Sequence, residues 1–162
     1  MAAVDELLAA NRSFSEGFDE GGKPMPPARG VVVVTCMDAR IDPAKALGLE
    51  IGDAHVIRNA GGVATDDAIR SLAISQRLLG TEEIVLLHHT DCGMLTFSDD
   101  AFRQDIEKET GIRPSWSAEA FPDPAADVRQ SVNRIKASPF IPETDRVRGF
   151  VFDVATGGLD EV

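Results

Sequence analysis

The two cysteines of this 162-residue chain lie where a metal ion could use both of them. Cys36 follows an apolar run at 31–35, and Cys92 follows a second apolar run at 84–87, with His89 three residues before it. Two thiolates and one imidazole form a soft ligand set that suits Zn²⁺. Three protein ligands leave one coordination position open, which is the pattern of catalytic rather than structural zinc sites.

Other interpretations of the cysteines remain open at this point. A single cysteine at a strand end is most simply a small buried hydrophobe. A redox pair is weaker, because the two residues do not have Cys-x-x-Cys spacing. A nucleophilic cysteine with a histidine base leaves the second cysteine without a role. The matching positions of Cys36 and Cys92, together with His89, favour the metal site.

Asp38 and Arg40 lie two and four residues after the first cysteine and could act on a water molecule bound to the metal. Two thiolates balance the charge of Zn²⁺, so such a centre acidifies its water less than a three-histidine centre does. Asp38 can accept the hydrogen bond of that water, and Arg40 can hold the carboxylate in a bidentate, ionised arrangement. The residues therefore predict a zinc-bound hydroxide aimed at a small electrophile, with Asp38 and Arg40 as the catalytic pair.

The elements that must position these residues alternate between strand and helix. Strands are predicted at 31–35, 54–57, 83–88 and 148–154, and helices at 42–48, 65–80, 98–111 and from 123 onward past Ile135. This alternation is typical of an α/β domain with a mainly parallel sheet flanked by helices. A turn at 156–158 leads into a short extra edge segment.

A strand order of 2-1-3-4 would place the first and third strands side by side. In such sheets ligands bind outside the carboxyl ends of the strands, at the point where the strand order reverses. Both halves of the cysteine–histidine set lie just past those ends. The topology therefore predicts that Cys36, His89 and Cys92 meet in one site.

The N-terminal segment reads as an arm. Residues 4–14 predict an amphipathic helix, with its apolar face formed by Val4, Leu7, Leu8 and Phe14. A stretch rich in Gly and Pro at 17–29 separates it from the rest, so we expect a loosely tethered helix that packs on a neighbouring subunit or on its own core. The predicted organisation is a single domain, 1–162, with the arm and linker at 1–29 and the α/β core at 30–162.

Charge and hydropathy exclude several classes of protein. The formal net charge of −11 argues against a nucleic-acid partner, since phosphate binding needs clustered Lys and Arg. No apolar run approaches the ~18 residues of a membrane span, so no membrane partner is expected. The acidic N-terminus does not resemble a signal peptide. We therefore expect a reducing cytoplasm, where a cysteine pair more often binds metal than forms a disulfide.

Four further residues have ordinary structural interpretations. His88 alternates with His89 along a strand, so a packed or hydrogen-bonded side chain is expected rather than a ligand. Asp91, inside the ligand loop, is expected to stabilise a turn. Arg58 is expected to be an interface charge, and Trp116 fits packing as well as it fits recognition.

Three segments resemble the β-class carbonic anhydrases, in the order that family shows. The family has Cys-x-Asp-x-Arg after the first strand and His-x-x-Cys after the third, with an Arg-Asn-Ala-Gly segment between them. The corresponding segments here are Cys36-Met37-Asp38-Ala39-Arg40, His89-Thr90-Asp91-Cys92 and Arg58-Asn59-Ala60-Gly61. The resemblance runs from about residue 31 to residue 94, and more loosely to residue 154.

The resemblance implies one Zn²⁺ per subunit on Cys36, His89 and Cys92, and a dyad of Asp38 and Arg40. It implies reversible hydration of CO₂ to bicarbonate and a proton. In some members the aspartate of the dyad swings onto the zinc as a fourth ligand and closes the site, so Asp38 is a metal ligand in a closed state only.

The resemblance also implies homodimers, often paired into homotetramers, with clefts at the subunit interface and an N-terminal helix over the partner. Relatives with this fold hydrolyse CS₂ or COS at the same kind of zinc site, which is one alternative activity. A non-catalytic bicarbonate or pH sensor, with Asp38 on the zinc, is a second. The chain has no tyrosine, so any role that tyrosine fills elsewhere in the family falls to other residues.

Overall fold

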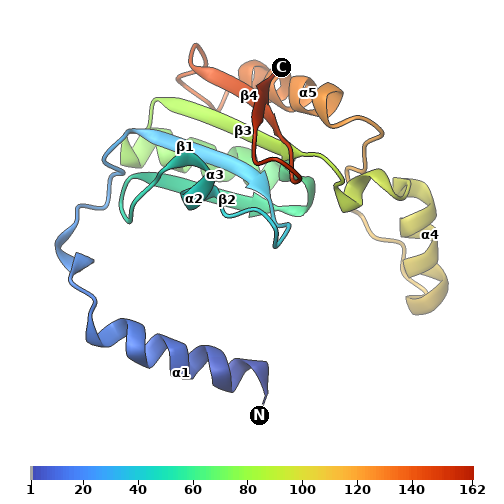
Figure 1. Cartoon of the computed structure of the whole chain (residues 1–162). Coiled ribbons are helices and arrows are strands. Elements are labelled where there is room, and N and C mark those ends of the chain that lie inside the picture. Colours follow the sequence, from blue (N-terminus) through green and yellow to red (C-terminus); the bar gives the residue numbers. More distant parts are fainter. Residues whose placement is uncertain (1) are drawn as a thin grey trace.

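The computed structural model describes residues 2–162 as an α/β fold built on one five-stranded sheet (Figure 1). The strand order is β2-β1-β3-β4-β5, which confirms the predicted order and adds the edge segment as a fifth strand. The first four strands are parallel and β5 runs antiparallel to β4. The strands are β1 (Val31–Cys36), β2 (Ala54–Asn59), β3 (Glu83–His89), β4 (Val147–Phe152) and β5 (Leu159–Glu161).

Five α-helices surround or extend from this sheet. They are α1 (Ala3–Glu16), α2 (Pro43–Leu47), α3 (Asp66–Leu79), α4 (Asp99–Thr110) and α5 (Pro124–Ala137). Short 3₁₀ turns, η1 (Glu20–Gly22), η2 (Ala60–Gly62) and η3 (Gly93–Leu95), complete the described chain. Among the described residues, no helix combines the length and apolar character needed to cross a membrane.

Capping residues explain why the helix boundaries could be predicted. The Thr65 hydroxyl accepts a hydrogen bond from the backbone N–H of Ala68, and Gly80 ends α3 in the left-handed conformation. Asp123 caps α5 in the same way as Thr65 caps α3. Ser98 occupies the predicted N-cap of α4, but its side chain makes no capping hydrogen bond.

Two hydrophobic clusters hold the sheet in place. The first joins the strand residues Val32, Val34, Ile84 and Leu86 to Leu72 of α3 and Ile135 of α5, so both helices cover the same face. The second lies at the carboxyl ends of the strands and contains Cys36, Ile41, Leu87, Cys92, Met94 and Phe121. The central strands β1 and β3 are therefore buried and can hold their terminal residues rigidly.

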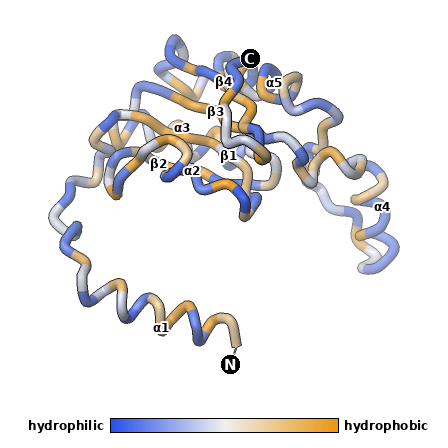
Figure 2. Tube along the Cα trace, viewed as in Figure 1, coloured by the Kyte–Doolittle hydropathy of each residue, from blue (hydrophilic) through white to orange (hydrophobic). Residues whose placement is uncertain are grey.

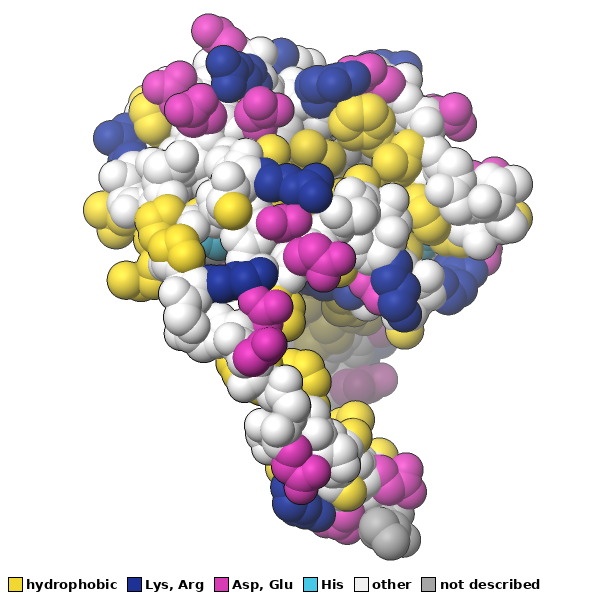
Figure 3. Space-filling view, turned by 60° about the vertical axis from the view of Figure 1, so that its left-hand side comes forward, with side chains coloured by type: hydrophobic (Ala, Val, Ile, Leu, Met, Phe, Trp, Pro, Cys, Tyr) yellow, Lys and Arg dark blue, Asp and Glu magenta, His cyan; other side chains and the backbone are white. Residues whose placement is uncertain are grey.

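The predicted arm is helix α1, and it stands away from the body (Figures 1 and 3). None of its described residues is buried, and Figure 2 shows hydrophobic and hydrophilic residues interspersed along its Cα trace. Leu7, for example, is 69% exposed. Packing of the arm on its own core, one of the two expectations, is not what the structure shows.

The linker after the arm is held more firmly than we expected from its Gly and Pro content. Lys23 donates a hydrogen bond to the carbonyl of Ile51 at 2.6 Å. Arg29 forms an ion pair with Asp53 at 3.0 Å and donates to the carbonyl of Gly48. These side-chain bonds, together with backbone hydrogen bonds from Ala28 to Gly52 and from Arg29 to Asp53, fix residues 23–29 of the linker to the core.

Candidate metal centre

Cys36, His89 and Cys92 meet at the carboxyl ends of β1 and β3. One potential ligand atom from each residue lies within 4.8 Å of the others. Cys36 is the last residue of β1, His89 is the last residue of β3, and Cys92 follows in the next turn. The parallel pairing of β1 with β3 brings the three together, although 53 positions separate Cys36 from His89 (89 − 36 = 53).

The donor atoms of this cluster fit a soft divalent cation. Nδ1 of His89 donates to the carbonyl of Thr90 at 2.8 Å, so its proton is on that nitrogen. Nε2 of His89 is buried and has no hydrogen-bond partner among the described residues, which leaves its lone pair directed at the cluster. Both cysteines are buried and free. An orphaned imidazole nitrogen beside two thiols is the arrangement that Zn²⁺ would complete.

The two thiols influence each other strongly. The neighbouring Cys92 lowers the pKa of the Cys36 thiol well below its usual range, against the opposing effect of burial. The Cys36 thiolate in turn raises the pKa of Cys92, and burial adds to the increase. The protein alone thus supports one negative charge on the pair, and a bound cation would displace the remaining proton.

Asp38 lies beside the cluster and is held by Arg40. Its Oδ1 accepts hydrogen bonds from Nε and the backbone N–H of Arg40 at 3.0 and 2.9 Å, and its Oδ2 accepts from Nη2 at 2.8 Å. These bonds keep the pKa of Asp38 well below its usual range. Oδ2 is 3.7 Å from Nε2 of His89, so the carboxylate reaches the edge of the candidate centre while remaining bonded to Arg40.

Asp91 was missed by the sequence analysis, which gave it only a turn role. Its Oδ2 accepts a hydrogen bond from Nη1 of Arg40 at 2.7 Å, and its carbonyl accepts one from Nη2 at 2.8 Å. Asp91 adopts a left-handed backbone with φ of 53°, which turns the loop between His89 and Cys92 toward Arg40. Its contact with Arg40 could have been predicted from an acidic residue in the loop after β3 and an arginine in the loop after β1.

Arg58 makes contacts within the chain that the sequence did not predict, while its expected role as an interface charge stays a prediction. Its Nε donates to the carbonyl of Cys36 at 3.0 Å and its Nη2 donates to the carbonyl of Asp38 at 2.8 Å. Strand β2 extends through Arg58 and Asn59 instead of ending at residue 57, and this places the guanidinium beneath the ligand loop. Arg58 therefore braces the backbone that carries both Cys36 and Asp38.

Gly61 occupies a position where a side chain would not fit. Its φ is 82°, a conformation that L-residues with a Cβ rarely adopt. A Cβ there would lie 3.0 Å from side-chain atoms of Phe121 and Val63, and 3.1 Å from Met94. The turn η2 thus fits closely between the second hydrophobic cluster and the candidate centre.

We therefore expect Gly61→Ala to lower the free energy of unfolding by about 1–3 kcal/mol, from backbone strain and crowding together. Urea unfolding of the metal-stripped protein measures this. Gly22→Ala is the matched control, because Gly22 lies in open space without a positive φ. Equal unfolding free energies for the two variants would contradict the expectation.

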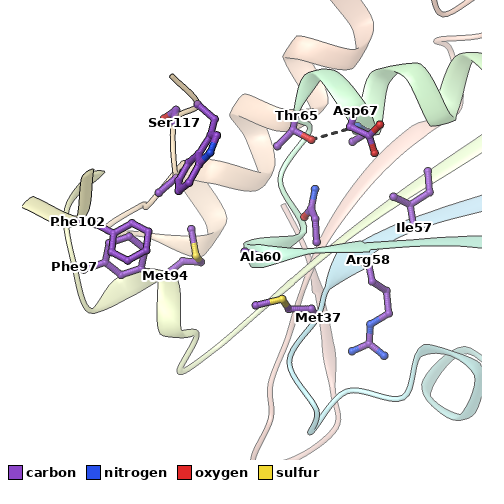
Figure 4. A pocket seen from close by; sticks show the side chains of 14 residues that line it. Met37, Ile57, Arg58, Ala60, Thr65, Asp67, Met94, Phe97, Phe102 and Ser117 are labelled. Carbon is purple, nitrogen blue, oxygen red and sulfur yellow. Dashed lines mark hydrogen bonds between the residues drawn. The ribbon is translucent and has the colours of Figure 1, made fainter. Parts of the chain in front are cut away.

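The candidate centre opens into a largely apolar space. A cavity of about 340 Å³ is lined by Cys36, Asp38, Cys92 and Phe97, among others. It shares wall residues with a second cavity of about 500 Å³, which Trp116 also lines. Figure 4 shows the second cavity between two groups of side chains, one with Met94, Phe97 and Phe102, and the other with Met37, Ile57 and Arg58. A small apolar molecule could approach the centre through this space.

His88 is a hydrogen-bonded residue, as expected, and does not join the cluster of Cys36, His89 and Cys92. Its Nε2 lies 2.7 Å from Oδ2 of Asp127 on α5. His55, the remaining histidine, is bonded through Nδ1 to the Ser75 hydroxyl at 2.7 Å. Of the three histidines, only His89 therefore faces the two cysteines.

Comparisons with known proteins identify relatives of this chain among the carbonic anhydrases. A family model described as carbonic anhydrase matches residues 31–124. The chain is 60% identical over 162 residues to beta-carbonic anhydrase 1 of Mycobacterium tuberculosis, covering 100% of this chain and 99% of the relative. It is 36% identical over 165 residues to a carbon disulfide hydrolase of Acidianus sp., covering 85% and 79% of the two chains.

Solved structures agree with these sequence relatives. The crystal structure of carbonic anhydrase from Streptococcus mutans matches with a TM-score of 0.93 and 42% identity. That match covers 100% of this chain and 98% of the other. The agreement in backbone structure therefore extends over the whole chain, the arm included.

Proposed function

Because the chain belongs to the β-class carbonic anhydrases, we propose that Cys36, His89 and Cys92 hold one Zn²⁺ per subunit for the reversible hydration of CO₂. The products are bicarbonate and a proton. The observation that carries the zinc assignment is the buried Nε2 of His89, which has no other partner among the described residues and lies with the two thiols. When bound, Zn²⁺ supplies the Lewis acidity that brings the pKa of water toward neutrality.

Asp38 and Arg40 are the proposed catalytic pair. Oδ2 of Asp38 is the carboxylate oxygen 3.7 Å from Nε2 of His89, and we assign it as the acceptor for the O–H of the reacting water. Arg40 keeps the carboxylate ionised and fixes its plane. Asp91 holds the guanidinium from the other side, as a positioning residue.

The position of Asp38 supports an open centre. Asp38 would become a metal ligand in a closed state only after giving up its side-chain hydrogen bonds to Arg40. Those bonds are charge-assisted and bidentate, which is a strong arrangement. We therefore propose that the resting site leaves a coordination position for water, and this speaks against the sensor alternative.

The apolar cavities suit CO₂, which is small and uncharged. CS₂ shares these properties, so the cavity alone does not distinguish the two substrates. The relatives do favour one: the beta-carbonic anhydrase matches at 60% identity over the whole chain, and the carbon disulfide hydrolase at 36%. Hydrolysis of CS₂ or COS is not favoured.

Stopped-flow CO₂ hydration with zinc-loaded protein tests the proposal, alongside metal analysis of the same sample. We expect one zinc per chain and hydration that disappears on chelation and returns with added zinc. CS₂ turnover measured under the same conditions should be much the slower reaction. Zinc-free protein with two titratable thiols, or zinc-loaded protein without hydration at any pH, would refute the proposal.

Self-association is the proposed use of α1. Its apolar face is exposed along its whole length, and the linker holds it away from the body. We propose a homodimer in which each arm covers the partner, with a homotetramer as the larger assembly. We also propose a cytoplasmic setting, supported by two free thiols that must stay reduced to bind metal.

Charging the apolar face of the arm is expected to dissociate the dimer. Leu7→Lys combined with Leu8→Lys would place two cations in the proposed interface, and sedimentation velocity should then show the mass of one chain. Ala9→Lys combined with Ser13→Lys adds the same charge to the opposite helix face and should leave the dimer intact. Identical sedimentation of the two double variants would argue against the arm as the interface.

A further inference from the structure

A buried polar pair lies behind the candidate metal centre and is used by none of the steps above. His88 of β3 is fully buried, and its Nε2 is 2.7 Å from Oδ2 of Asp127. Asp127, on α5, is only 8% exposed. The His88 ring also packs on Phe121, with centroids 5.3 Å apart.

Burying this polar pair between β3 and α5 costs more free energy than burying apolar side chains there would. Nδ1 of His88 is buried without a hydrogen-bond partner among the described residues. An apolar pair of similar volume would avoid both that orphaned nitrogen and the buried carboxylate. A hydrogen bond differs from apolar packing in being directional, so it can fix the rotation of a backbone segment.

The segment that the pair would fix carries a metal ligand. His88 and His89 are consecutive residues of β3, and consecutive strand residues project to opposite faces of the sheet. Anchoring the His88 ring to α5 therefore sets the direction in which His89 leaves the strand. Phe121, beneath the His88 ring, belongs to the same hydrophobic cluster as Cys36 and Cys92.

We propose that His88 and Asp127 are positioning residues, whose hydrogen bond holds the end of β3 so that Nε2 of His89 faces the two thiols before metal binds. The proposal rests on the proposed function, since a prearranged ligand matters only if the centre holds Zn²⁺. Loss of the bond should weaken zinc binding and CO₂ hydration together while all three ligands remain.

Variants at His88 separate the hydrogen bond from the bulk of the side chain. His88→Gln keeps an N–H near the position of Nε2, His88→Leu keeps the volume without the bond, and Asp127→Asn keeps an acceptor. Ile135→Ala is the matched control, since Ile135 is equally buried on α5 but packs in the other cluster. It should destabilise the fold without touching the pair.

Three measurements are made on each variant: zinc affinity by chelator competition, the unfolding midpoint of metal-stripped protein, and the visible spectrum of Co²⁺-substituted protein. We expect His88→Leu to raise the zinc Kd about tenfold, the lower end of the effect of removing supporting partners of metal ligands. Its Co²⁺ spectrum should change as well. His88→Gln and Asp127→Asn should stay close to the unmodified protein, and Ile135→Ala should lower the midpoint with little change in Kd.

The proposal is overturned if His88→Leu and Ile135→Ala have the same zinc affinity and the same Co²⁺ spectrum. The His88–Asp127 pair would then be a structural contact only. If His88→Leu does not fold, His88→Asn replaces it, because the shorter asparagine side chain cannot reach Asp127. A zinc affinity of His88→Asn equal to that of His88→Gln would also overturn the proposal. Failure of the unmodified protein to bind zinc would instead refute the proposed function, so the two failures are distinguishable.

Discussion

Cys92→Ser is expected to abolish zinc binding at ordinary metal concentrations and CO₂ hydration with it. The substitution changes one sulfur to oxygen in a buried position, so the fold loses little volume. A serine hydroxyl stays protonated at neutral pH and is not among the usual zinc ligands. Because loss of a mere supporting partner costs about 10–100-fold in metal affinity, loss of a ligand should cost more than about 100-fold.

The measurement combines zinc affinity by chelator competition with stopped-flow hydration. Zinc should also raise the unfolding midpoint of the unmodified protein and leave that of Cys92→Ser unchanged, because only a bound ligand stabilises the native state. Ile141→Val is the control, since it trims a buried residue of the other hydrophobic cluster and keeps the centre intact. One tightly held zinc in Cys92→Ser would show that the ligand set is wrong.

Asp38→Asn is expected to slow CO₂ hydration by about 10²–10⁴-fold while zinc binding remains, which is the range for loss of a general acid–base group. Asparagine keeps the shape of the aspartate side chain but not its charge. Its amide has one oxygen that accepts hydrogen bonds, whereas the carboxylate has two. The bonds from Arg40 weaken accordingly. Stopped-flow hydration from near-neutral to alkaline pH, with zinc content measured in parallel, checks this.

Two neighbours of Asp38 should give a graded series. Arg40→Lys replaces a bidentate fork by a point charge, so the carboxylate loses its fixed plane and the rate falls by a smaller factor. Asp91→Asn should have the mildest effect, because the Asp91 carbonyl still accepts from Nη2 of Arg40. Asp105→Asn is the control, as it breaks a similar aspartate–cation pair, with Lys108, on α4.

Unchanged hydration in Asp38→Asn would remove the dyad from the mechanism. Loss of zinc in the same variant would instead assign Asp38 to the ligand set, as in the closed state. The two results are easily told apart, because metal content and rate are measured on one sample. The series therefore tests the role of the carboxylate separately from the presence of the metal.

Much of the fold could be predicted because its signals are local. Thr65, Asp123 and Gly80 mark helix ends through contacts within a few residues of themselves. The apolar run of β1 shows directly that this strand is buried. Where two strands meet is not a local property, yet the alternation of strand and helix restricts the order enough to place Cys36 beside His89.

Residue types and their positions in the sequence were enough to predict a candidate metal site, because the two cysteines and His89 stand at or just past the ends of two apolar strands. The contacts that support this candidate site became visible only in the folded structure. Asp91 lies 51 positions from Arg40, and His88 lies 39 positions from Asp127, yet each pair is in direct contact. Ligand identity is a property of residue type, whereas support for a ligand depends on which surfaces folding brings together, and no local pattern encodes that.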